Sequence, residues 1–135
     1  MKIFFWLFML VMLLILPGTM LFFGNEFLRR PGAINSGYGY RTKRSMASQE
    51  AWDFAHRTCG RLWMRLGKWL MAATVAAMLP PLGFLTIEKI SMWSIGIMAV
   101  QLIVMIGTLF PVERALKKNF DQYGRPIQGQ GTENN

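Results

Sequence analysis

The chain has 135 residues, of which 53% are hydrophobic and only 16% are charged, and its formal net charge at pH 7 is +8. This mixture is unusual for a soluble domain, and the apolar residues are gathered into blocks with the charges between them, as in a protein that lies in a bilayer. The excess of basic residues falls between the blocks, so it indicates membrane topology and does not require a nucleic-acid partner.

The first block, IFFWLFMLVMLLILPGTMLFF at residues 3–23, contains no charge. At about 1.5 Å per residue, a helix of this length covers the roughly 30 Å hydrocarbon core, so we predict a transmembrane helix. A secretory signal peptide is the alternative, because Lys2 precedes the block, but no small-residue cleavage site follows it. Pro17 and Gly18 are expected to kink this helix rather than end it.

Two later blocks predict further spans at about 66–87 and 90–111, separated only by Glu88 and Lys89. Spans joined so tightly form an antiparallel hairpin. Gln101 is the one strongly polar side chain well inside the third block, and we favour an interhelical hydrogen bond over a role in a polar pathway. Small residues at four-residue spacing in the second block predict close contact with a facing helix: Ala72, Ala73, Ala76 and Ala77.

The basic residues predict the orientation of these spans. Residues 24–68 hold nine Lys or Arg, the tail after Phe110 holds four, and the hairpin and the N-terminus hold one each. By the positive-inside rule, the N-terminus lies outside, and the loop at 24–65 and the C-terminus are cytoplasmic. We therefore expect an all-α membrane protein with one integral membrane domain at 1–124 and a disordered tail at 125–135.

The sequence changes character at Ser48, which is a plausible N-cap for a helix that begins near Gln49 and leads into the second span. Its basic side is expected to anchor at anionic lipid headgroups, while Phe54 and His56 fit neither side. One arc of this amphipathic helix is apolar (Trp52, Ala55, Cys59, Leu62, Trp63 and Leu66) and the opposite arc is basic (Arg57, Arg61, Arg65 and Lys68).

A turn-rich loop precedes this helix, with glycines that allow close backbone approach, and we expect it to be ordered. Its motif N-x-x-x-G-Y-R-T (Asn35, Gly39, Tyr40, Arg41 and Thr42) is followed by W-x-x-A-H-R (Trp52, Ala55, His56 and Arg57). The combination resembles the SdpI/YfhL family of small bacterial membrane proteins, and the segment at 113–124 is similar to the end of shorter members. The resemblance covers about residues 24–124.

The resemblance implies a multipass protein of the bacterial cytoplasmic (inner) membrane. Its family type includes immunity proteins, which protect a cell from a membrane-active peptide toxin. Longer members have six spans rather than three, and a homo-oligomer, such as a homodimer, would supply the missing spans. The lipid bilayer, with its anionic headgroups, and a peptide toxin are the expected partners.

The motif residues are the candidate binding site for a ligand or partner. Arg41 would supply a fork of hydrogen-bond donors to Glu50, Asp53, a lipid phosphate or a helix C-terminus, or would only lock the loop. Asn35 and Thr42 would hold the turn, and Gly39 would permit close approach of the backbone. Trp52 would fix the loop against the helix. These candidates are Asn35, Gly39, Tyr40, Arg41, Thr42, Trp52, His56 and Arg57, and the lipid-headgroup candidates are Arg57, Arg61, Arg65 and Lys68.

Catalysis finds little support in the sequence. Cys59 is the only cysteine, His56 is the only histidine, and no acid lies within a predicted span. A three-residue spacing on a helix does not orient a base toward a thiol, so we expect no enzymatic activity, no metal and no cofactor. Two functions remain: protection from a toxin, and a membrane-anchored docking role in which the basic loop binds a partner protein or anionic lipid.

Overall fold

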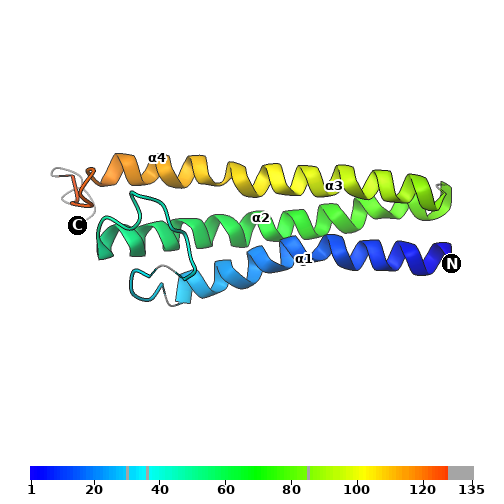
Figure 1. The fold of residues 1–135 in the computed structure, drawn as a ribbon, viewed down its shortest axis with the longest axis horizontal. Coiled ribbons are helices and arrows are strands. Elements are labelled where there is room, and N and C mark those ends of the chain that lie inside the picture. The colour runs from blue at the N-terminus through cyan, green and yellow to red at the C-terminus, as the bar shows by residue number, and fades with distance from the viewer. Residues whose placement is uncertain (30, 36, 85, 128–135) are drawn as a thin grey trace.

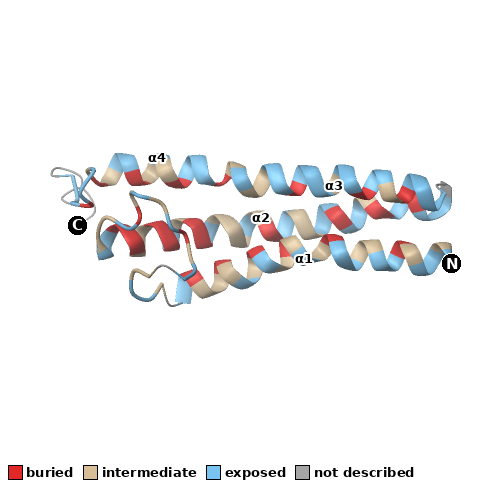
Figure 2. Ribbon diagram, viewed as in Figure 1, coloured by how far each residue is buried: buried red, intermediate tan, exposed pale blue. Residues whose placement is uncertain are grey.

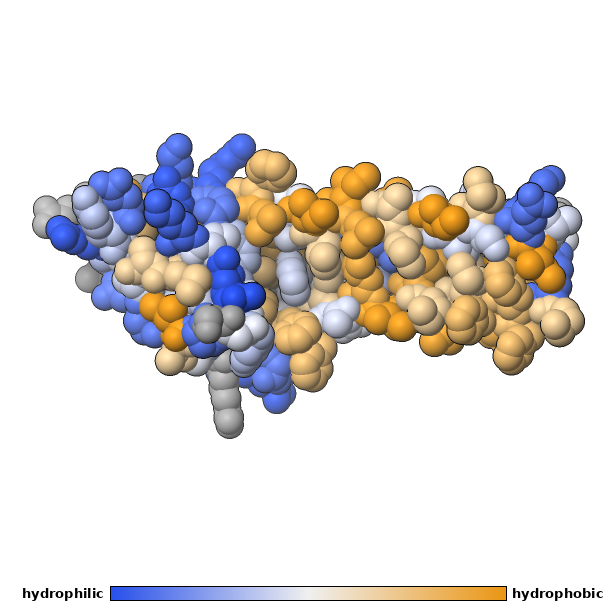
Figure 3. Space-filling model, in the orientation of Figure 1, coloured by the Kyte–Doolittle hydropathy of each residue, from blue (hydrophilic) through white to orange (hydrophobic). Residues whose placement is uncertain are grey.

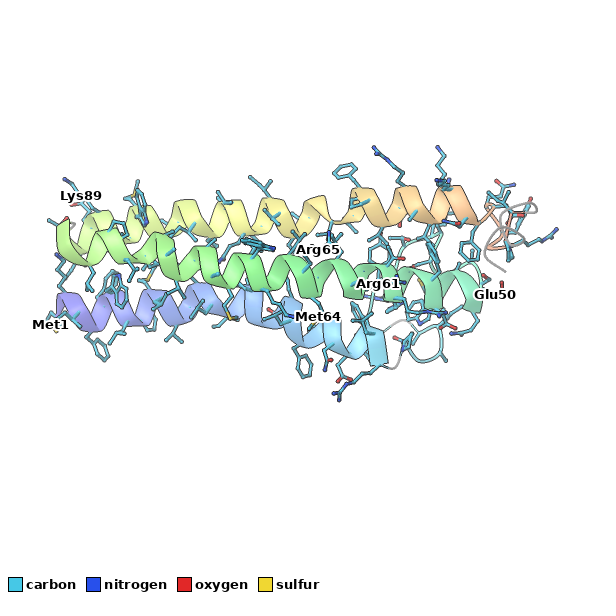
Figure 4. The ribbon with its side chains drawn as sticks, turned by 180° about the vertical axis from the view of Figure 1, so that it is seen from behind. Met1, Glu50, Arg61, Met64, Arg65 and Lys89 are labelled. Atoms are coloured by element: carbon cyan, nitrogen blue, oxygen red, sulfur yellow. The ribbon has the colours of Figure 1, made fainter. Side chains whose placement is uncertain are left out.

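The computed structural model describes residues 1–29, 31–35, 37–84 and 86–127. Within these ranges it contains four α-helices and no β-strand: α1 (Lys2–Arg29), α2 (Gln49–Phe84), α3 (Ile87–Gly107) and α4 (Leu109–Asn119). Helix α2 runs antiparallel to α1 and to the α3–α4 pair, and the three rods lie side by side (Figure 1). Met1 and Lys89 lie at one end and Glu50 lies toward the other (Figure 4). The predicted all-helical class is confirmed.

Helix α1 continues through Pro17, as predicted, and extends to Arg29, beyond the predicted span at 3–23. A proline lacks the N–H that would bind the carbonyl four residues earlier, so the Leu13 carbonyl needs another donor. The side chain of Gln101 on α3 supplies it, with Nε2 at 3.0 Å from the Leu13 oxygen and 2.8 Å from Oγ1 of Thr74 on α2. The predicted interhelical hydrogen bond of Gln101 is confirmed, and it joins all three rods.

A side chain also replaces the missing backbone donor at Pro81 of α2. Pro81 cannot bind the carbonyl of Ala77, and the Trp93 indole N–H from α3 donates to that oxygen at 2.8 Å. The Trp6 indole N–H from α1 donates to the next carbonyl, that of Met78, at 2.6 Å. Where water is absent, such side-chain donors keep irregular helices free of unpaired carbonyls.

Helices α1 and α2 pack closely through glycines. A Cβ atom added at Gly60 would lie 2.8 Å from the carbonyl oxygen of Gly24, so the two backbones touch there. The predicted contact through the alanine stripe of α2 is wrong for these three rods, because Ala72, Ala73 and Ala76 are exposed. The glycines permit a closer approach than alanine does, and they turn a different face of α2 toward α1.

The predicted third span is divided between two helices. Glu88 and Lys89, which were expected to form the hairpin turn, lie in the first turn of α3, after Thr86 as its N-cap. The helix breaks at Thr108, because Pro111 cannot donate to the carbonyl of Gly107.

Two helical stretches among the described residues are long and apolar enough to cross a bilayer, α1 and Ile87–Asn119. Helix α2 is not one of them: charges fill its first half, and alanine and proline, which are less apolar than leucine, are frequent in its second. A hydrophobic surface nevertheless extends along the bundle between hydrophilic ends (Figure 3). The span at 66–87 stays a prediction.

Buried residues gather at the loop end of the bundle, where α1, α2 and α4 meet (Figure 2). The prediction that disorder begins at residue 125 is wrong for its first part. Arg125 donates its backbone N–H to the Asp121 carboxylate at 2.8 Å, and Ile127 donates to the carbonyl of Asn119 at 3.0 Å. The remainder of the predicted disordered tail, 128–135, lies outside the described residues.

The glycine contact gives a first prediction. We expect Gly60→Ala to lower the free energy of unfolding by about 1–3 kcal/mol, because the new methyl group must push two helix backbones apart. Gly96→Ala is the matched control, since a Cβ at that helical position meets no atom within 4 Å. Thermal unfolding in detergent micelles measures both, and equal stability of the two variants would contradict the close contact.

Candidate functional site

The loop between α1 and α2 is held by hydrogen bonds at its first turn. The Asn35 side-chain oxygen accepts the backbone N–H groups of Gly37 and Tyr38, at 2.9 and 3.0 Å. The Trp52 indole N–H on α2 donates to the carbonyl of Pro31 at 3.0 Å. The predicted roles of both residues are confirmed, because Asn35 forms the turn and Trp52 binds the loop to the following helix.

Gly39 brings the loop against α2. Its φ of +118° favours glycine, and an added Cβ would lie 2.6 Å from Nε2 of His56. The next backbone N–H, that of Tyr40, donates to the same Nε2 atom at 3.0 Å. The close approach predicted for Gly39 is therefore confirmed, and His56 is the residue that it approaches.

The hydrogen bonds of His56 define its protonation. A backbone N–H can only donate, so Nε2 must carry a lone pair, and Nδ1 must carry the proton that it donates to the Trp52 carbonyl at 2.8 Å. The side chain is 1% exposed, between the rings of Trp52 and Phe27. Burial lowers the pKa of His56, although its bond to the Trp52 carbonyl and the nearby Asp53 carboxylate oppose this shift. The imidazole is thus held neutral.

Tyr40 connects the loop to α4. Its hydroxyl donates to Oε1 of Glu113 at 2.8 Å, across 73 positions of sequence. Burial, and then the hydrogen bond to the Glu113 carboxylate, raise the pKa of Tyr40 well above its usual range, so the phenol keeps its proton. Tyr40 therefore binds α2 with its backbone and α4 with its side chain.

A second turn follows at Thr42. The backbone N–H of Thr42 donates to the Ser45 hydroxyl at 2.8 Å, and this hydroxyl donates to the carbonyl of Tyr40 at 2.9 Å. Ser48 then caps α2 by accepting the N–H of Ala51 at 3.0 Å. The predicted helix start near Gln49 is confirmed, as is the part of Thr42 in a turn.

Arg41 is exposed and lines a cavity of about 200 Å³ beneath the loop. Phe27, Trp63 and Leu109 contribute apolar walls, and Cys59 lies at the side of α2. Burial raises the pKa of Cys59 to about 12, so its sulfur stays a protonated thiol. The loop thus presents one guanidinium beside a small apolar cavity.

The basic row of α2 is exposed along its length, and it comprises Arg57, Arg61, Arg65 and Lys68. Arg57 and Arg61 each direct Nε toward the carbonyl four residues earlier, at 3.4 and 3.3 Å. Arg57 does not line the cavity beneath the loop, as Gly39 to Thr42 do, and lies instead beside Pro31 and Asp53. Figure 4 labels Arg61 and Arg65 on the middle rod.

Sequence reasoning missed two residues of the site, Glu113 and Ser45. Glu113 follows the last predicted span, and its distance in sequence from Tyr40 gave no sign of their contact. Ser45 lies among basic residues, yet it is buried. Phe54, which the helical pattern left unexplained, packs against Phe120 with ring centroids 5.3 Å apart.

Long apolar helices beneath a polar, hydrogen-bonded end define a helical membrane protein by class. A family model for the SdpI/YfhL protein family matches residues 33–112, which is more than half of the chain. The chain belongs to the SdpI/YfhL family, as its loop motif predicted. Neither a search of curated proteins nor a search of solved structures found a match.

The neutral His56 predicts a pH dependence of stability. Because its folded pKa lies below the usual 6.5, the unfolded chain binds more protons between the two values, and stability falls as pH decreases through that window. We expect the melting temperature to fall between about pH 7.5 and about pH 5.5 by more in the native chain than in His56→Gln, whose amide oxygen can accept the Tyr40 N–H without titrating. Equal falls would contradict a neutral His56.

The Tyr40–Glu113 bond predicts a coupling energy. We expect Tyr40→Phe to destabilise the fold by about 1–3 kcal/mol, since a hydrogen bond to a charged group is lost. In a double-mutant cycle with Glu113→Gln, the two losses should not add, because each removes part of the same interaction. Urea unfolding in micelles gives all four free energies, and strictly additive losses would show that the contact contributes nothing.

Proposed function

We propose that this protein protects a bacterial cell from a membrane-active peptide toxin. The observation that carries the proposal is the family match over residues 33–112, which includes the whole loop motif and the start of α2. The family resemblance implies an immunity role. The ordered loop supports a specific surface rather than a passive linker, because its hydrogen bonds hold Arg41 beside a cavity.

The proposed topology has three spans in the bacterial cytoplasmic membrane, with the N-terminus outside and the C-terminus inside. Its second span is the half of α2 that follows Lys68, which carries no charge as far as Phe84. This half is supported as a span by the Trp93 indole, which binds the Ala77 carbonyl that Pro81 leaves free, an arrangement suited to surroundings without water. The basic residues of the loop, of α2 and of α4 would all face the cytoplasm.

In the proposed action, the toxin or its membrane target contacts the loop end of the bundle and the neighbouring span surfaces. Arg41 would bind a carboxylate or phosphate with its fork of donors, while the rigid loop keeps the side chain in place. The binding would keep the toxin from depolarising the membrane. A homodimer would complete the six spans of longer family members.

The experiment measures survival and membrane potential of a sensitive bacterium that expresses the native chain and is challenged with membrane-active peptide toxins. We expect protection by the native chain and by Lys117→Ala, an exposed residue of α4, and at least tenfold lower survival with Arg41→Ala. Immunoblots of membranes establish equal protein levels. Survival that is the same with and without the native chain, for every toxin tested, would contradict the immunity role.

A second candidate function is docking, in which the basic cytoplasmic surface binds a partner protein or anionic lipid and the spans only anchor it. The exposure of all four residues in the basic row of α2 favours this candidate. Replacing Arg57, Arg61, Arg65 and Lys68 together by Gln separates the two functions. Docking predicts that this variant loses activity while changes on the span surfaces have no effect, whereas toxin binding predicts that span changes matter equally.

A further inference from the structure

Two cavities of the bundle belong to one groove between α1 and the α3–α4 rod. The larger, of about 500 Å³, lies between Met12–Phe23 on α1 and Met98–Met105 on α3. The smaller, of about 200 Å³, lies beneath the loop. Trp63 lines both, and the walls continue by single helical turns from Phe23 to Phe27 and from Met105 to Leu109. We call this the α1–α3 groove.

The larger cavity is apolar and opens at the side of the bundle. Met12, Ile15, Met98 and Leu102 line it and are each 39–54% exposed, so a ligand can reach it from the side. Methionine side chains are flexible and adapt to chains of irregular shape. This part of the groove suits a hydrocarbon chain, which needs neither a fixed outline nor hydrogen-bond donors.

The smaller cavity has the chemistry of a membrane surface. The Trp63 indole N–H is bound to the Thr108 hydroxyl at 3.0 Å, and Tyr38 from the loop lies 6.4 Å from the Phe23 ring, as aromatic side chains do at headgroup depth. Arg41 lines this end, and its positive charge complements a phosphate.

We propose that the α1–α3 groove binds one anionic phospholipid, with an acyl chain along the Met-lined walls and the phosphate beside Arg41. The arrangement of side chains along the groove supports this assignment. Apolar side chains line the part within the proposed spans, and the positively charged Arg41 lies at the end of those spans. The bound lipid would fill the space between these two rods beside the Gln101 contact. This site is separate from the exposed basic row of α2, which faces elsewhere.

The test is native mass spectrometry of the full chain, released from nanodiscs that contain equal amounts of phosphatidylglycerol and phosphatidylcholine. We expect one retained phosphatidylglycerol per chain. Arg41→Gln should lower its retention relative to phosphatidylcholine about fivefold, the effect of one basic residue near an anionic headgroup. Lys117→Gln, an exposed cation outside the groove, should leave the ratio unchanged.

A second pair of variants tests the groove itself. Leu102→Trp fills the apolar part and should abolish retention of both lipids, whereas Ile103→Trp, on an exposed part of the same helix, should not. Equal retention of the two lipids by the native chain would overturn the anionic assignment. Equal retention by the two Trp variants would overturn the groove. Neither result bears on protection from a toxin, which the survival experiment measures separately.

Discussion

The hydrogen bond from the Tyr40 backbone to Nε2 of His56 is the interaction on which the loop end of the bundle depends. This bond requires that His56 is buried and neutral. It also requires a glycine at position 39, because a side chain there would keep the loop away from α2. Once the backbone of Tyr40 is fixed, its hydroxyl reaches Glu113 on α4, so that one residue ties the loop to two helices. Arg41 follows Tyr40 directly in the chain, so the fixed backbone of Tyr40 places Arg41 beside the cavity.

A second constraint acts within the bundle, at carbonyls that prolines leave without a backbone donor. Gln101 and Trp93 come from α3 to supply donors at Leu13 and Ala77, one on each of the other rods. These bonds fix the relative depth of the helices, since a shift by one residue would leave a carbonyl without a donor. Pro17 and Pro81 therefore help to define how the helices align, and neither of them ends its helix.

Much of this architecture could be predicted from local sequence. Apolar blocks located the helices, Ser48 located the start of α2, and the motif indicated that Gly39 and Trp52 bring the loop against the helix. The helical pattern left His56 unexplained, and its bond to the loop came from the structure. The sequence could not reveal the Tyr40–Glu113 contact, because nothing local links residues so far apart. The alanine stripe was misassigned because small residues indicate only that close packing is possible, and the closer approach at Gly24 and Gly60 determined which face of α2 meets α1.

The most direct test of this account is hydrogen–deuterium exchange of the Tyr40 amide, measured by NMR in micelles for the native chain and for His56→Phe. We predict that the native Tyr40 amide exchanges as slowly as amides in the middle of α2, and that it exchanges far faster in the variant, while the Tyr38 amide, bound within its own turn to Asn35, changes little. A Tyr40 amide that exchanges rapidly in the native chain would contradict the His56 bond and, with it, the ordered site that the loop is proposed to form.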